Sequence, residues 1–437
     1  MFKEGRRISR RDFLKGLGLT AGALTLSGLS LSFKGFSQPA VVKVGTLFPY
    51  TGPGSEWGPH MRNTADLCAG QINEAAEELL GGPVLNLIHE DTETMPSPAV
   101  DRARKLVEVD RVPVLIGSWS SGVTIAVAES VTMPAAILHV VPVATSPFIG
   151  VLPADTQDLL FRTIASDAIQ GVVAAQLARG EIFPGYKFDT ASVIFVDNPY
   201  GRGLAEQFAR SFEKRGGKVL AQVPHPEEPL PTYTAELEKA LAGKPEVLLP
   251  INYPGHAVIL LKECLEIFDY TSWQFPDALK SLRVFEAIGG EVLAGRMGTV
   301  QAADPKRAGF IKFAEAYKEA YGEMPPLPFL DTTYDAVAVT GLAVAKCAID
   351  KVEPTPFNIR DRLRPVATPP GTLVGVEEFK AALEALIRGE EIDYSGAAGE
   401  VNFDERGEVI TPIEIWMFTE AGITTVMIRS PEEIPPE

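Results

Sequence analysis

The sequence predicts an α/β protein with two Rossmann-like lobes, each built on a parallel sheet and joined by a hinge that the chain crosses several times. Short apolar runs alternate with longer amphipathic stretches over residues 41–301, a pattern typical of βαβ units. The alternation occurs twice, which indicates two similar lobes rather than one large sheet. No low-complexity linker separates the two series, as expected for a chain that passes between lobes more than once.

Residues 1–37 are expected to be a signal peptide of the twin-arginine type. Ser9–Lys15 reads S-R-R-D-F-L-K, and an uncharged run, Gly16–Phe33, follows it. About 20 apolar residues span a bilayer, so an uncleaved anchor is the alternative. Gly, Ser and Thr dilute this run, however, and a weakly apolar stretch behind basic residues is typical of export signals. The sequence therefore predicts an exported protein.

Charge and cysteine content narrow the possible partners. The formal net charge is −17, and it becomes about −22 without the seven basic and two acidic residues of 1–37. Such a surface repels nucleic acid and anionic lipid, so neither is expected as a partner. The three cysteines, Cys68, Cys264 and Cys347, are far apart and odd in number. We therefore expect a fold that does not depend on disulfides.

The first lobe is expected to comprise residues 41–163 and about 303–410. Apolar runs of four to eight residues indicate buried strands, and a 3.6-residue apolar spacing indicates helices. The strands expected in its first part are Val41–Phe48, Val84–His89, Val112–Gly117 and Ile137–Pro142. The helices expected between them are Gly58–Glu78, Pro98–Val109 and Thr124–Thr132. The chain is expected to leave this lobe near Arg162–Ile164, and Thr333–Ala348 is expected to be a long apolar helix.

The second lobe is expected to comprise residues 164–302 and about 411–437. Its expected strands are Ser192–Val196, Lys218–Val223, Val247–Ile251 and Gly295–Gln301. Its expected helices are Gly203–Arg215, Tyr233–Ala242 and Ala257–Ile267. Late in the chain, Gly399–Gly407 and Ile410–Thr419 are expected to form a hairpin with Asp404–Gly407 as its turn.

Three loops lie where parallel sheets bind ligands, beyond the carboxyl ends of strands. Pro49–Gly58 nearly matches a dinucleotide fingerprint, but its third glycine comes one position late, so no nucleotide is expected. Gly117–Thr124 offers hydroxyls and free N–H groups at the start of a helix, which suits a carboxylate. Helix capping is the alternative for this loop. Pro142–Pro147 adds hydroxyls, with an ordinary turn as the alternative.

No catalytic motif is recognisable. Two residues after Gly117 comes Trp119 instead of the serine of a nucleophile elbow, and the sequence has neither a Walker A loop nor H-E-x-x-H. His89–Asp91 and Glu93 could hold a metal, but acids at a strand end more often cap the next turn. We therefore expect no enzymatic activity, no cofactor and no metal.

Five short motifs occur in an order and spacing typical of one family. They are T-G-P-x-x-x-W-G, G-x-W-S-S-x-x-T, A-T-S-P, D-x-x-Y-G-R-G and Tyr334–Ala336. Over residues 41–425 the chain thereby resembles the leucine/isoleucine/valine-binding proteins of the type I periplasmic binding fold. The resemblance implies a monomeric, periplasmic substrate-binding protein of an ABC importer. It would close its lobes on a small amino acid of the neutral, branched-chain type and deliver it to a membrane permease.

The resemblance also implies which first-lobe residues bind the ligand. Ser121 and the backbone of Gly122 match the site that holds the ligand α-carboxylate. Thr145 and the main chain of Val143 match further contacts of the ligand. Trp57 occupies the place of an aromatic residue that packs on the ligand side chain.

On the opposite wall, Tyr200 and Tyr253 match two pocket tyrosines. Asp277 falls near an acid that pairs with the ligand α-ammonium, and Phe329 matches an apolar wall residue. This arrangement suits a zwitterion, because a buried charge must be satisfied by partners at both ends or desolvation dominates. Charge-assisted hydrogen bonds supply such partners.

Departures from the family pattern leave the ligand open. The small first-lobe disulfide of the family is absent, since Glu93 and Ser120 stand at the matching positions. The acid at 277 is Asp rather than Glu. An aromatic carboxylate, an amide or urea therefore remains an alternative ligand, and a ligand-sensing module for a membrane receptor remains an alternative function.

Overall fold

The structure is a computed structural model that describes residues 38–435. The expected twin-arginine signal peptide lies outside the described residues. Within 38–435, none of the helices is both long enough and apolar enough to cross a bilayer.

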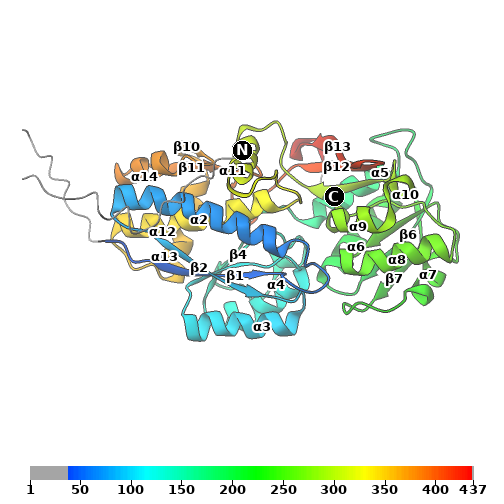
Figure 1. Ribbon diagram of the computed structural model, residues 1–437, viewed down its shortest axis with the longest axis horizontal. Coiled ribbons are helices and arrows are strands. Elements are labelled where there is room, and N and C mark those ends of the chain that lie inside the picture. Colours follow the sequence, from blue (N-terminus) through cyan, green and yellow to red (C-terminus); the bar gives the residue numbers. More distant parts are fainter. Residues whose placement is uncertain (1–37, 436–437) are drawn as a thin grey trace, which may run out of the picture. The chain divides into compact units, whose positions relative to one another are not determined.

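A five-stranded parallel sheet forms the centre of the first lobe (Figure 1). Its strand order is β2-β1-β3-β4-β5, and this parallel pairing confirms the expected βαβ arrangement. The strands are β1 (Val42–Phe48), β2 (Leu85–Asp91), β3 (Val114–Gly117), β4 (Leu138–Val141) and β5 (Leu160–Arg162).

Helices cover both faces of this sheet, which explains why its strands are apolar on both sides. On one face lie α2 (Gly58–Leu80) and α12 (Leu330–Asp350), and on the other α3 (Pro96–Arg104) and α4 (Ser121–Val127) (Figure 1). Successive strand residues alternate between these two layers: Leu115 packs with the α3–α4 core, whereas Val114 and Ile116 belong to the main core. Both α3 and α4 continue as π-helical turns, Lys105–Asp110 and Ala128–Thr132.

The second lobe also contains a parallel sheet, with strand order β7-β6-β8. Its strands are β6 (Thr190–Val196), β7 (Lys218–His225) and β8 (Val247–Ile251). Parallel bridges from Leu248 to Trp273 and from Phe275 to Gly298 join this sheet to a three-stranded antiparallel one of order β13-β12-β9. The latter comprises β9 (Met297–Gln301), β12 (Ile413–Thr419) and β13 (Gly422–Arg429). The helices of this lobe are α5 (Asp167–Ala178), α6 (Pro199–Lys214), α7 (Thr234–Leu241), α8 (Pro254–Glu266), α9 (Leu282–Ile288) and α10 (Gly290–Leu293).

The chain passes between the lobes more than once, which confirms the expected fold class. After β9 it returns to the first lobe through α11 (Ala308–Tyr321) and α12, and continues with α13 (Pro356–Ala367), β10 (Thr372–Gly375), α14 (Phe379–Ile387) and β11 (Ile392–Ser395). Directly after β5, where the chain leaves the first lobe, the Thr163 hydroxyl donates to the carbonyl of Thr332 in α12 at 2.9 Å. The residue limits of the two lobes stay a prediction.

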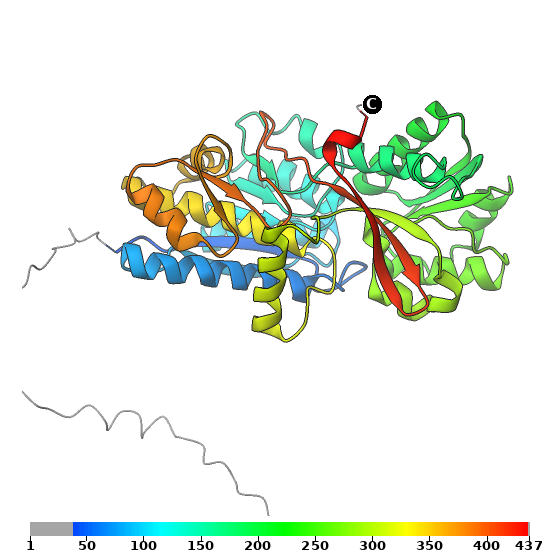
Figure 2. The same ribbon diagram turned by 90° about the horizontal axis from the view of Figure 1, so that it is seen from above.

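The hairpin expected over residues 399–419 is wrong. Residues 401–412 contain no strand, and the hairpin lies later, between β12 and β13 (Figure 2). Asp404–Gly407 does turn, because the Gly407 N–H donates to the Asp404 carbonyl at 3.1 Å. The Gly407 carbonyl, however, accepts the N–H of Arg162 at 2.7 Å. The carbonyl at the end of the turn thus pairs with β5 instead of with a neighbouring strand of a hairpin.

Asp335 of α12, from the Y-D-A motif, fixes the loop that follows β11. Its carboxylate accepts the backbone N–H groups of Ala397 and Ala398 at 2.7 and 2.8 Å. The Tyr394 hydroxyl donates to the same group at 3.1 Å. A Cβ at Gly396 would lie 2.4 Å from this carboxylate, so the loop needs glycine there. Burial raises the pKa of Asp335 to about 7, although the two N–H bonds favour its ionised form.

Candidate functional site

The first-lobe wall of the candidate site comes from the loops after β3 and β4. Ser121 begins α4, and its hydroxyl oxygen accepts the N–H of Ser146 at 3.2 Å. Val143 and Thr145 belong to the next loop, and both are buried. Gly117 makes the sharp exit from β3 possible: its φ is +150°, and a Cβ there would lie 2.7 Å from the Leu47 carbonyl oxygen. Hydroxyls and backbone amides thus gather at one sheet edge, as expected.

The second-lobe wall is aromatic and acidic. Tyr200 lies in the first turn of α6, and Tyr253 directly precedes α8. Their rings stack with centroids 5.5 Å apart and an interplanar angle of 13°. The Tyr200 hydroxyl donates to Asp277 at 2.7 Å, and the Gln170 amide donates to the same oxygen at 3.2 Å. Two neutral donors therefore hold this carboxylate in place.

Seven of the nine predicted residues line one cavity of about 10 Å³. They are Ser121, Val143, Thr145, Tyr200, Tyr253, Asp277 and Phe329, and Trp119 and Ala278 complete the lining. The lobes touch across this cavity, because the Ser120 and Tyr253 hydroxyls are 3.0 Å apart. Ligand pockets usually measure about 300–1,000 Å³. A molecule the size of an amino acid therefore needs the two walls to separate before it can enter.

Two predicted residues, Trp57 and Gly122, are not part of this lining. Trp57 is fully buried beneath Trp119, 4.9 Å away between ring centroids, and its indole N–H donates to the Pro328 carbonyl at 3.1 Å. Gly122 faces the second lobe, where a Cβ would lie 3.2 Å from the Glu227 carboxylate.

Trp119 occupies the position beside the cavity that we expected for Trp57. Its ring centroid lies 4.7 Å from that of Tyr253. The Trp119 ring packs closely on Gly54, in the loop between β1 and α2: a Cβ at Gly54 would lie 2.7 Å from that ring. The sequence alone does not show this contact, because Gly54 and Trp119 lie in different loops.

A second buried acid, Asp167, lies behind Thr145 and was not predicted. It accepts the Thr145 hydroxyl at 2.9 Å and the Gln301 amide at 3.2 Å. Burial raises the pKa of Asp167 well above its usual value, and the charge of Asp277 raises it further. Burial likewise raises the pKa of Asp277. A cation beside Asp277 would offset both its burial and this repulsion.

Several buried polar atoms at this site have no hydrogen-bond partner among residues 38–435. They are the indole N–H of Trp119 on the cavity lining and the side-chain oxygens of Gln170 and Gln301, whose amides contact the two acids. Buried polar atoms are rarely left without a partner in native proteins. Of these residues Trp119 lines the cavity, so an acceptor atom of a bound molecule would match its indole N–H.

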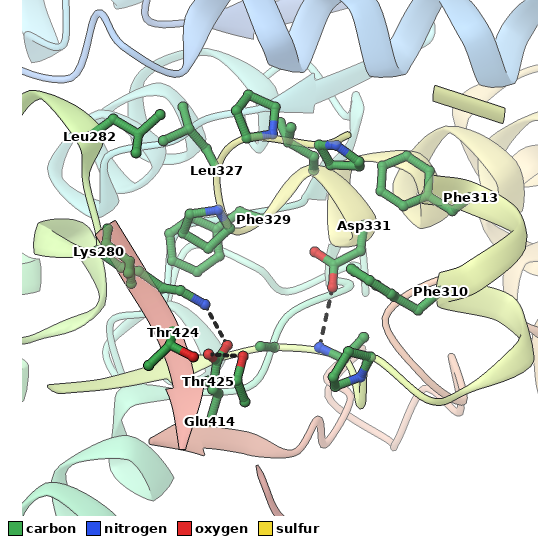
Figure 3. Close-up of a pocket in the computed structure, with 18 residues that line it drawn as sticks. Lys280, Leu282, Phe310, Phe313, Leu327, Phe329, Asp331, Glu414, Thr424 and Thr425 are labelled. Carbon is green, nitrogen blue, oxygen red and sulfur yellow. Dashed lines mark hydrogen bonds and ion pairs between the residues drawn. The ribbon is translucent and has the colours of Figure 1, made fainter. Parts of the chain in front are cut away.

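Phe329 also lines a second, larger cavity of about 260 Å³ (Figure 3). Its walls include Phe310 and the ion pair between Lys280 and Glu414, 2.5 Å apart. Asp331 in the same cavity accepts the N–H of Ala303 at 3.2 Å. The charged groups of this cavity already have partners, and of the predicted residues it contains Phe329 alone, so we place the candidate site in the smaller one.

Over residues 38–435, no group of three or more His, Cys, Asp or Glu side chains is arranged to hold a metal ion. His89 instead contacts Thr46 at 2.7 Å and Asp66 at 3.0 Å. The three cysteines are free and buried.

The chain is similar to a known protein family, to relatives in other organisms and to a solved structure. A family model described as periplasmic binding protein matches residues 41–413. Over 393 residues the chain is 30% identical to the chemotactic signal transduction system substrate-binding protein BasB of Halobacterium salinarum, with 88% of each chain covered. It is 28% identical to the leucine-, isoleucine-, valine-, threonine-, and alanine-binding protein of Pseudomonas aeruginosa, over 78% of this chain and 87% of that one. The crystal structure of the leucine-binding protein LivK of Thermotoga maritima has the same fold, with a TM-score of 0.72 at 21% identity over 90% of this chain and 100% of that one.

Proposed function

Because the chain belongs to the periplasmic binding protein family, we propose that it binds a neutral aliphatic amino acid between its lobes and performs no reaction on it. One observation carries this proposal. Hydroxyls and amides from the first lobe and the buried acid Asp277 from the second lobe meet at one cavity, and a second buried acid, Asp167, lies behind Thr145. That polarity matches a zwitterion, with the carboxylate toward the first lobe and the ammonium toward the second. A carboxylate without an ammonium would instead face Asp277 uncompensated.

In the proposed complex, the Ser121 hydroxyl and the free N–H groups at the start of α4 hold the α-carboxylate. The indole N–H of Trp119 is a further donor for it. Asp277 accepts the α-ammonium, and Asp167, whose raised pKa favours its neutral form, lies behind Thr145. Tyr253 and Phe329 exclude water from an uncharged side chain. Binding then proceeds by hinge closure: the ligand binds the open first lobe, and the second lobe closes over it.

We place this protein outside the cytoplasmic membrane as the monomeric substrate-binding component of an ABC importer. The family match and the twin-arginine motif in the sequence support this location. The closed form would dock on a membrane permease, which then takes up the ligand. The proposal involves no cofactor and no nucleic acid.

A second candidate function is ligand sensing for a membrane receptor. The relative BasB, named as part of a chemotactic signal transduction system, favours it. Uptake of labelled L-leucine by cells with and without the gene separates the two functions. An importer component is expected to lose uptake on deletion, whereas a sensor is expected to lose the chemotactic response to leucine and keep uptake.

A thermal-shift panel tests the ligand class. Neutral aliphatic amino acids are expected to raise the melting temperature, since a ligand that binds only the native state stabilises it. Aromatic carboxylates, amides and urea are included as the alternative ligands. A shift with any of these and none with the amino acids would overturn the proposed ligand.

Ser121→Ala is expected to weaken binding of the amino acid that gives the largest shift by about tenfold, because a hydrogen bond to a charged group contributes about 1.5–3 kcal/mol. Isothermal titration calorimetry measures the change. Thr64→Ala, a change of a fully buried hydroxyl on α2 outside the cavity, is the matched control and is expected to leave affinity unchanged. Equal affinities of Ser121→Ala and the wild type would place the carboxylate elsewhere.

Binding is also expected to depend on pH. The ammonium needs an ionised Asp277, and burial raises the pKa of this carboxyl above its usual value. Affinity is therefore expected to fall as the pH is lowered through that raised pKa, because protons then compete with the ammonium. Titrations between pH 8 and pH 5 measure the effect. Asp277→Asn, which cannot ionise, is expected to bind weakly at every pH in this range.

A further inference from the structure

A carboxylate from the first lobe reaches a helix of the second lobe outside the ligand cavity. Glu56, in the loop between β1 and α2, accepts the Ser281 hydroxyl at 2.5 Å. Its other oxygen accepts the backbone N–H groups of Leu282 and Arg283 at 3.0 and 3.2 Å. All three donors lie at the start of α9, so one side chain makes three hydrogen bonds between the lobes.

The chemistry of this contact is that of a helix cap supplied from another lobe. The first N–H groups of a helix have no partner within it, and the helix dipole favours negative charge at this end. The hydroxyl oxygen of Ser281 accepts the N–H of Val284 at 3.2 Å, which leaves its own proton for Glu56. The start of α9 thus offers one hydroxyl and two backbone N–H groups as donors, and the negatively charged Glu56 carboxylate accepts all three.

The same loop makes a second link between the lobes. The carbonyl of Pro53 accepts the N–H of Gly255, in the first turn of α8, at 3.1 Å. The backbones approach so closely there that a Cβ at Gly255 would lie 2.8 Å from Pro53. Neither Pro53 nor Glu56 lines the ligand cavity. The loop can therefore influence closure without touching the ligand.

We propose that Glu56 is a closure latch, a positioning residue that sets how much of the protein is closed and how long the ligand stays bound. Its three hydrogen bonds form only when the lobes meet, so they stabilise the closed state and not the open one. A ligand held by the closed state binds more tightly in proportion to the closed fraction. The effect on the ligand rests on the proposed function, whereas the effect on closure does not.

Closure without ligand is the first test. The three native cysteines are buried, so spin labels can be attached at Glu108→Cys on the first lobe and Glu238→Cys on the second, which are both exposed. Glu56→Gln keeps the size of the side chain and removes its charge. We expect it to shift the distance distribution toward the longer, open separation. Glu74→Gln, the same change on the exposed face of α2, is expected to leave the distribution as in the wild type.

Release of L-leucine, measured by stopped-flow kinetics, is the second test. In Glu56→Gln the dissociation rate is expected to rise about five- to tenfold, with little change in the association rate, because the latch forms after the ligand has bound. Ser281→Ala is expected to act in the same direction, and the double variant to be less than additive. A role of Glu56 limited to stabilising its own loop would lower the melting temperature and leave distances and rates unchanged.

The two tests distinguish a failure of the proposed latch from a failure of the proposed ligand. If L-leucine does not bind the wild type, the proposed function fails and the distance measurement alone decides on the latch. Distances in Glu56→Gln that equal those of the wild type would overturn the latch, whatever the ligand. Open distances without ligand combined with faster release support it.

Discussion

Replacing Asp277 by alanine is expected to weaken binding of L-leucine by about two to four orders of magnitude, because removing one partner of a buried ion pair costs about 3–5 kcal/mol. The ligand ammonium would lose its carboxylate, and the Tyr200 hydroxyl and the Gln170 amide would lose their acceptor. Isothermal titration calorimetry at pH 8 measures the effect.

Two further variants separate charge from shape at this acid. Asp277→Asn keeps the volume and an acceptor for Tyr200, so an equally large loss of affinity would identify the charge as the cause. Asp167→Asn removes the second acid, which does not line the cavity, and a smaller loss is expected. Wild-type affinity in Asp277→Asn would show that this residue is not the ammonium partner.

Asp335→Ala is expected to lower the free energy of unfolding by about 2–5 kcal/mol, since each buried donor left without a partner costs about 1–3 kcal/mol. The donors are the N–H groups of Ala397 and Ala398. Urea denaturation followed by circular dichroism measures the loss. Asp335→Asn keeps one acceptor oxygen and is expected to lose less than Asp335→Ala.

The stability contribution of Asp335 is also expected to depend on pH. Its pKa rises from an ordinary value of 3.8 to about 7 on folding, so the folded state holds a proton that the unfolded state releases. Stability is therefore expected to fall as the pH rises from about 4 to about 7, and Asp335→Asn is expected to be flatter over this range. A wild type that becomes more stable than Asp335→Asn across this window would mean that the two N–H bonds outweigh burial.

Local patterns predicted the elements that build the core. The runs behind β1, β3 and β8 are short, largely apolar and bounded by turn residues, so their length and composition predicted strands. The prediction of the late hairpin was wrong because a contact that is distant in sequence replaces a local one. The turn at Asp404–Gly407 is real, but the Gly407 carbonyl accepts the backbone N–H of Arg162, far away in sequence. Local turn chemistry does not reveal a competitor of that kind.

The residues of the candidate site were likewise predicted only in part. Motifs in sequential order brought seven residues to one cavity, because loops after neighbouring parallel strands share a sheet edge. Trp119 and Asp167 were missed because their roles depend on tertiary contacts. Trp119 lies over Trp57 only after two loops pack together, and Asp167 at the start of α5 has the sequence context of an ordinary helix start. Glu56 likewise gains its role only when the lobes meet.

The central claim is that the cavity between the lobes recognises both ends of a zwitterion. Titration calorimetry of the purified protein with L-leucine and with 4-methylpentanoate, which is leucine without its amino group, tests it most directly. We expect L-leucine to bind and the deaminated acid to bind at least about a hundredfold more weakly, since it leaves Asp277 without a cation. Equal or tighter binding of 4-methylpentanoate would contradict the claim.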